Sequence, residues 1–225
     1  MARSSEIEIA KYIDHTNVNP NSTPRDIEKL CREARKYNFY GVVVLPYYVK
    51  LARKLIRGTK IKLSTVIGFP FGVQCTEAKL KEIELTFRYV DEFDVVMNRP
   101  AFKARDYSYV LRELKKIVRT AKGKPVKVII ETPELTDREI KKAAKLVLES
   151  EAAFVKTAVG LKGPTKLKHV KLIASIVKGK IGIKASGGIR TYKQALAFIK
   201  AGATRIGSSH GVEIMKTMGR ERGLR

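Results

Sequence analysis

The sequence is poor in cysteine, in tryptophan and in long apolar runs. Its 225 residues include two cysteines, Cys31 and Cys75, without CxxC spacing, so neither a disulfide framework nor a metal site is predicted. A chain of this length buries roughly 70% of the surface that its unfolded form exposes, so its core is stable without disulfides or a structural metal. No apolar stretch approaches the roughly 18 residues of a membrane span, and the first residues are charged where a signal peptide is apolar. We therefore expect a cytoplasmic protein without a membrane partner.

Acidic residues are also scarce relative to basic ones. Lys and Arg total 46 against 22 Asp and Glu, which gives a net charge of +24. A charge of this size is typical of proteins that bind nucleic acid, anionic lipid or phosphorylated substrates. The basic residues recur along the whole chain at the spacing of solvated helix faces, and only Gly219–Arg225 resembles a short basic tail. We therefore expect these residues to form solvated helix faces, and we expect no nucleic-acid partner. The scarcity of glutamine (Gln74 and Gln194) and the high charge density are typical of thermophile proteins.

Short apolar runs, rich in β-branched residues, recur eight times with helical stretches between them. We expect strands at Tyr12–His15, Gly41–Leu45, Leu63–Ile67, Phe93–Met97, Val126–Glu131, Phe154–Thr157, Ile181–Ala185 and Arg205–Gly207. Each unit has about 28 residues, which is enough for a strand, a helix and two short loops. Continuously apolar strands are typical of parallel sheets buried on both faces. The sequence therefore predicts an α/β fold, a single-domain (β/α)8 TIM barrel over residues 1–225, with an open doubly wound sheet as the alternative.

Helix ends are marked by capping residues. Thr23 to Asp26 supplies an N-cap, a proline at the first helical position and an acid in the first turn, and Thr136 to Glu139 reads as a capping box. These signals support helices directly after residues 23 and 136.

Two lysines occupy equivalent places in consecutive apolar strands. Lys156 and Lys184 are 28 residues apart, so we expect them on neighbouring strands, near the end of the barrel that carries reactive groups in this fold. Burial and mutual repulsion lower the pKa of an amine below its usual value of about 10.4, and a neutral amine is a nucleophile toward carbonyl carbon. The residues alone do not say which lysine attacks. The alternative is that both point outward and reach water.

Carboxylates inside strands form a second group. Asp94 interrupts an apolar strand and can pair with an ammonium group or relay protons; the alternative is a purely structural ion pair. Asp14, near Thr16 on the first strand, is a similar but weaker case.

Glycine-rich turns follow the last two predicted strands. One contains Gly187 and Gly188, and the other contains Gly207, Ser208, Ser209 and His210. Such turns before helix N-termini expose backbone N–H groups, and they lie where barrels of this kind bind phosphate. Ordinary tight turns are the alternative.

Several unusual strings in these regions resemble the deoxyribose-phosphate aldolase family of class I aldolases. The strings are Ile13–Thr16, Val66–Gly72, Asp91–Asp94, Lys127–Thr132, Phe154–Thr157, Lys184–Arg190 and Arg205–Ser209. The resemblance implies reversible cleavage of 2-deoxy-D-ribose 5-phosphate to acetaldehyde and D-glyceraldehyde 3-phosphate, without metal or organic cofactor. It also implies deoxyribonucleotide catabolism and a homo-oligomer, dimer or tetramer.

The resemblance also implies residue roles. Lys156 falls on the Schiff-base lysine, Lys184 on the lysine that lowers its pKa, and Asp94 on a proton-relaying aspartate. The two glycine turns match phosphate-binding segments. We add Asp14, Thr16 and Thr157 to the expected substrate-binding residues.

The sequence departs from the family pattern at several positions. Ala158 and Val159 replace a serine and a threonine, Val43 and Leu45 replace a cysteine and an asparagine, and His210 replaces a small polar residue. The chain ends in Gly223-Leu224-Arg225 and lacks a terminal tyrosine. These departures leave open a sister Schiff-base aldolase with a shifted aldehyde substrate. A barrel that has lost catalysis and binds polyanions is a further alternative.

Overall fold

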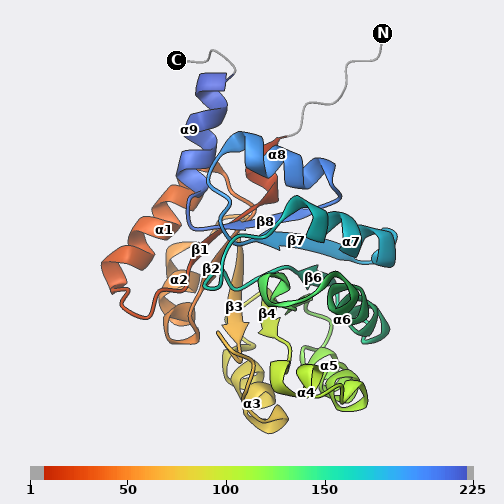
Figure 1. Ribbon diagram of the computed structural model, residues 1–225. Coiled ribbons are helices and arrows are strands. Elements are labelled where there is room, and N and C mark those ends of the chain that lie inside the picture. Colours follow the sequence, from red (N-terminus) through yellow and green to blue (C-terminus); the bar gives the residue numbers. More distant parts are fainter. Residues whose placement is uncertain (1–7, 222–225) are drawn as a thin grey trace.

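The computed structural model describes residues 8–221; the charged N-terminal residues and the C-terminal Gly223, Leu224 and Arg225 lie outside this range. Eight parallel strands close into a barrel in sequence order, with the last pairing to the first (Figure 1). The strands are β1 Ile13–Asn17, β2 Gly41–Val44, β3 Lys62–Ile67, β4 Glu92–Val96, β5 Val126–Ile129, β6 Phe154–Lys156, β7 Gly182–Ser186 and β8 Arg205–Ser208. The (β/α)8 prediction is confirmed, and the open sheet is excluded.

Helices surround the strands (Figure 1). They are α1 Pro24–Tyr37, α2 Val49–Leu55, α3 Thr76–Thr86, α4 Arg99–Lys103, α5 Tyr107–Thr120, α6 Asp137–Glu149, α7 Leu167–Val177, α8 Tyr192–Lys200 and α9 Gly211–Glu221, with short 3-10 turns at Ile9–Tyr12, Pro46–Tyr48 and Thr132–Glu134. The predicted capping box is present at α6, where the backbone N–H of Thr136 donates to Glu139 at 2.7 Å and the N–H of Glu139 donates to the Thr136 hydroxyl. Within residues 8–221, no helix is long and apolar enough to cross a membrane.

The alternation of side chains along each strand separates two buried regions. In β2, Val42 and Val44 belong to the apolar core between the strands and the helices, so the intervening Val43 points into the barrel. Polar and charged residues fill much of the barrel interior with almost no exposure. An apolar layer between the strands and the helices therefore stabilises the barrel, whereas the barrel interior holds buried charged side chains.

Candidate active site

Asp94 lies at the centre of a buried ion-pair network inside the barrel. One carboxylate oxygen accepts from Lys127 of β5 at 2.8 Å, and the other accepts from Lys156 of β6 at 2.7 Å and from Lys184 of β7 at 2.8 Å. Lys156 and Lys184 are also directly paired in the register of their strands. The expected proximity of the two lysines is confirmed, and the outward alternative is wrong.

The network extends to two further strands, β1 and β8, and to a second residue of β4, Glu92. Lys184 also donates to Asp14 at 2.5 Å, Arg205 bridges Asp14 and Glu92 at 3.0 and 3.2 Å, and Lys127 contacts Glu92 at 2.7 Å. With every group ionised, four cations face three carboxylates. One excess positive charge in a dry interior is unfavourable, so the network favours the loss of one proton from an amine.

Lys156 is the amine whose pKa falls. Burial lowers the pKa of Lys156 to about 8, and repulsion from Lys184 adds to the effect, while Asp94 opposes both. Mutual repulsion is therefore a smaller cause than loss of water. At pH 8, about half of the Lys156 amines are neutral nucleophiles.

Two neighbours of Lys156 in the network, Lys127 and Asp94, have pKa values shifted so that they stay charged. Burial works against the charge of Lys127, yet Asp94 and Glu92 raise its pKa. Burial likewise works against the ionised form of Asp94, but the three lysines hold its pKa well below the usual range.

Gly207 leaves room for the Lys184 side chain, because a Cβ at position 207 would lie 3.0 Å from Cε of Lys184.

A cavity of about 830 Å³ opens over the carboxyl ends of the strands, and Lys156 lines it. Of the expected substrate-binding residues, the following also line it: Thr16, Gly187, Gly188, Gly207, Ser208, Ser209 and His210. Asp94 and Lys184 have no exposed surface and lie beneath Lys156. Lys156 is thus the member of the network that a ligand can reach.

Asp14 and Thr157 do not lie where we expected them. Asp14 does not line the cavity, because its two oxygens pair with Lys184 and Arg205, which lower its pKa to about 2 against the opposing effect of burial. Thr157 is fully buried, and its hydroxyl donates to the backbone oxygen of Ser186. Both residues hold neighbouring strands together and have no free atom to offer a substrate.

The phosphate site also differs in part from expectation. The N-terminus of α8 is capped by the protein, since Thr191 and Gln194 cap each other and the N–H of Tyr192 donates to Thr217. The loops before α8 and α9 supply the donors that remain. Among the described residues, the backbone N–H groups of Gly188 and Ser209 have no protein acceptor, and both residues line the cavity.

Two cavity side chains have polar partners of their own. The Ser208 hydroxyl donates to the backbone oxygen of Ile189 at 2.6 Å and accepts the N–H of His210 at 2.9 Å. The His210 ring lies 3.0 Å from the Ser209 hydroxyl. Ser208 therefore shapes the loop, while Ser209 and His210 face the cavity as a pair.

Sequence reasoning assigned no role to several residues of the site. Lys127, Glu92 and Arg205 complete the network, and their signal was the same as for Lys156: a charge inside or at the start of an apolar strand.

His15, which lines the cavity, is paired with Glu33 at 2.9 Å. Two departures from the family pattern, Leu45 and Val159, also line the cavity and make part of its wall apolar. No group of three or more His, Cys, Asp or Glu within residues 8–221 could hold a metal ion.

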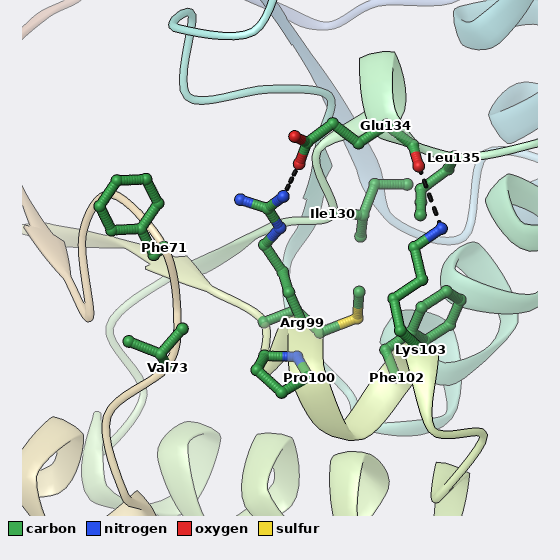
Figure 2. A pocket seen from close by; sticks show the side chains of 10 residues that line it. Phe71, Val73, Arg99, Pro100, Phe102, Lys103, Ile130, Glu134 and Leu135 are labelled. Atoms are coloured by element: carbon green, nitrogen blue, oxygen red, sulfur yellow. Dashed lines mark hydrogen bonds and ion pairs between the residues drawn. The ribbon is translucent and has the colours of Figure 1, made fainter.

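A second pocket, of about 450 Å³, lies over β4 and β5 (Figure 2). Phe71 and Val73 of the loop after β3 line it, while Phe69 and Pro70 of the same loop line the larger cavity. At its rim Arg99 forms an ion pair with the Glu134 carboxylate, and Lys103 donates to the Glu134 backbone oxygen at 3.1 Å (Figure 2). The loop after β3 thus borders both the larger cavity and the second pocket.

A parallel barrel with a cavity-lining amine of lowered pKa beside a second lysine and an aspartate fits the class I aldolases. The chain belongs to the family described as DeoC/LacD family aldolase, which it matches over residues 8–217.

Individual relatives agree with this assignment. The chain is 49% identical to a deoxyribose-phosphate aldolase from Thermococcus gammatolerans, over 93% of this chain and 96% of the relative, and 47% identical to one from Aciduliprofundum boonei, over 94% and 97%. The thermophile-like composition accords with a Thermococcus relative.

Solved structures agree as well. The fold superposes on an aldolase named QR15 with a TM-score of 0.92 at 41% identity, covering 98% of this chain and 100% of that one. It also superposes on a tetrameric deoxyribose phosphate aldolase from Aeropyrum pernix with a TM-score of 0.87 at 34% identity, covering 93% and 90%.

Proposed function

We propose that this protein reversibly cleaves 2-deoxy-D-ribose 5-phosphate to acetaldehyde and D-glyceraldehyde 3-phosphate through an imine on Lys156. The observation that carries the proposal is Lys156 itself: a cavity-lining amine with a pKa of about 8, held 2.7 Å from Asp94. The names of the curated relatives supply the substrate.

The first step forms the imine. The neutral Lys156 amine attacks C1 of the open-chain sugar, and the resulting carbinolamine loses water to give a protonated imine. Lys184 stays bound to Asp14 and Asp94, beneath the reacting amine, and so keeps a positive charge near it. This charge disfavours protonation of Lys156 before attack.

The second step breaks the C2–C3 bond, because acetaldehyde takes C1 and C2. The bonding electrons move to the imine nitrogen and leave an enamine, while the C3 hydroxyl loses its proton and becomes the aldehyde of glyceraldehyde 3-phosphate. Neither Asp94 nor Lys184 lines the cavity, so we assign the proton transfer to this pair acting through water. Protonation of the enamine at C2 and hydrolysis of the imine then release acetaldehyde and restore Lys156, so that no cofactor is consumed.

The phosphate group lies at the other end of the cavity in this proposal. The loops with Gly187, Gly188, Gly207, Ser208, Ser209 and His210 surround that end, and the free N–H groups of Gly188 and Ser209 are suited to an anion. The direct test is a cleavage assay with 2-deoxyribose 5-phosphate beside 2-deoxyribose and ribose 5-phosphate. Absence of cleavage of all three would contradict the proposal.

A second candidate function is a sister aldolase that joins other aldehydes. Leu45 and Val159 favour it, because both place apolar surface in the wall of the cavity at positions where the family pattern has polar side chains. Faster trapping of propanal than of acetaldehyde on Lys156 would support this reading.

Three further predictions accompany the proposed function. We propose a homo-oligomer, since the Aeropyrum pernix relative is tetrameric. A cytoplasmic location and the absence of a nucleic-acid partner remain predictions from the sequence. A barrel without catalysis is disfavoured, because retaining four buried cations around three carboxylates is unfavourable unless the charges have a use.

A further inference from the structure

Glu131 occupies a bulge where β5 ends beside β6. The backbone N–H groups of Ile130 and Thr132 donate to the backbone oxygens of Lys156 and Thr157 at 3.1 and 2.7 Å. The two donors are two residues apart in the chain, whereas the two acceptors are adjacent residues. A regular ladder has the same spacing on both strands, so the chain after β5 carries one extra residue, Glu131. Bulges of this kind re-aim a side chain and are common next to active sites.

The backbone of Glu131 is strained at this point. Its φ of 59° and ψ of 60° are left-handed, a conformation that costs a residue with a Cβ more than it costs glycine. A glutamate in this conformation points to a use for its side chain, because strained residues cluster at functional sites.

The side chain of Glu131 is only half satisfied. It has no exposed surface, and one carboxylate oxygen accepts the backbone N–H of Val159 at 2.9 Å. The other oxygen is buried and has no hydrogen-bond partner among the described residues. Glu131 also forms no ion pair within residues 8–221, so its charge is not neutralised by a contact as that of Asp94 is.

The Glu131 carboxyl binds the loop that lines the cavity and interacts electrostatically with Lys156. Burial raises the pKa of Glu131, whereas the Val159 N–H, Arg99 and Lys156 oppose the rise. Val159 itself lines the cavity, and Ile130 and Glu134, on either side of Glu131 in the chain, line the second pocket (Figure 2). A buried charge at this place acts on the reacting amine without touching bulk water.

We propose that Glu131 is a positioning residue of the aldolase reaction: it holds the loop after β6 over Lys156, and its carboxylate stabilises the positive charge of the imine formed there. The inference rests on the proposed function. Imine formation turns an amine that gains and loses its proton near pH 8 into a fixed cation, while all three carboxylates of the network are already bound to cations. Glu131 supplies the counter-charge that the network lacks.

Two substitutions separate the loop contact from the charge. Glu131→Gln keeps an oxygen for the Val159 N–H but removes the charge. Glu131→Gly removes both, yet relieves the strained backbone, so it is expected to fold. The matched control is Glu134→Gln, which removes a carboxylate from the same loop but on the side of the second pocket (Figure 2).

The experiment measures the yield of acetaldehyde trapped on Lys156 by borohydride across pH 6 to 10, together with kcat and KM for cleavage. For Glu131→Gln we expect the imine yield and kcat to fall about tenfold with KM changed little, the signature of lost charge stabilisation. For Glu131→Gly we expect the same fall in imine yield together with a higher KM, because the loop is released. Glu134→Gln should resemble the wild type.

The outcomes distinguish this inference from the proposed function. A normal adduct on wild-type Lys156, together with equal imine yield and kcat in Glu131→Gln, would overturn the role of Glu131 alone. A fall in melting temperature without any change in imine yield would also overturn it, because it would mark a structural residue. Absence of an adduct on Lys156 in the wild type would overturn the proposed function, and this inference with it.

Discussion

Lys127 and Lys156 donate to opposite oxygens of one carboxylate, Asp94, and yet their pKa values shift in opposite directions. Both side chains are buried, which favours the neutral amine. Lys127 has a second carboxylate, Glu92, at 2.7 Å, whereas Lys156 forms an ion pair only with Asp94 within residues 8–221 and faces the repulsion of Lys184. The number of carboxylates that each amine contacts therefore decides which lysine holds its charge and which one can attack a carbonyl group.

The first prediction concerns the site of imine formation. Acetaldehyde with borohydride should leave a reduced adduct on Lys156, because exposed lysines are protonated at neutral pH and react far more slowly. Peptide mapping by mass spectrometry locates the adduct, and Lys156→Leu should abolish it at every pH. An adduct found chiefly on Lys184 or spread over surface lysines would contradict the assignment.

The second prediction concerns pH. Since the pKa of Lys156 is about 8, the trapping rate should rise with pH through this value and level off above it, where the amine is neutral. Lys184→Leu removes a charge that repels the Lys156 ammonium group. It also frees Asp94 Oδ2, which Lys184 shares with Lys156, to pair with Lys156 alone. Both effects raise the pKa of Lys156. The rate profile should then move to higher pH. A profile that stays in place would show that Lys184 does not tune the amine.

The third prediction concerns Asp94, which is bound by three buried lysines. Asp94→Asn should lower the free energy of unfolding by about 3 to 5 kcal/mol, because it leaves buried cations without their partner. It should also reduce turnover by about 10²- to 10⁴-fold, since the amide carries no proton. Chemical denaturation and the cleavage assay measure the two effects.

A double variant separates these two roles of Asp94. Asp94→Asn with Lys127→Met restores the native excess of one cation in the network, so much of the stability should return while turnover stays low. Recovery of both stability and turnover would mean that Asp94 serves only as a structural ion-pair partner.

The fourth prediction concerns phosphate binding. A Cβ at Gly188 would lie 2.8 Å from Cβ of Pro164, at a φ of +76°, so Gly188→Ala should distort the loop and raise KM for 2-deoxyribose 5-phosphate but not for 2-deoxyribose. Gly179→Ala is the control, because its φ is +74° and no atom lies within 4 Å of the added Cβ. Equal changes of KM for both sugars would contradict a phosphate site at this loop.

A related substitution tests the side chain that departs from the family pattern. His210→Ser removes a ring that lines the cavity beside the Ser209 hydroxyl. If His210 donates to the phosphate, KM for the phosphorylated sugar should rise and inhibition by inorganic phosphate should weaken. Unchanged values would assign His210 to the packing of the loop.

Local sequence determined the barrel and most of the parts of its site. Eight apolar runs rich in β-branched residues predicted the strands to within one or two residues at most ends, because such runs suit a sheet buried on both faces. Charges inside these runs identified Lys156, Lys184 and Asp94, since a charge in a buried strand is unfavourable unless it is paired or used. Each of these signals depends on neighbouring residues in the chain.

Only the tertiary structure decided how these charges divide their roles. Asp94 is 62 residues from Lys156 and 90 from Lys184, and Lys184 is 170 residues from Asp14. Closure of the barrel brings them within hydrogen-bond distance, turns Asp14 away from the cavity and adds Lys127 to the network. A pKa depends on burial and on charges a few ångströms away, and those distances arise from the fold and not from the order of residues along a strand.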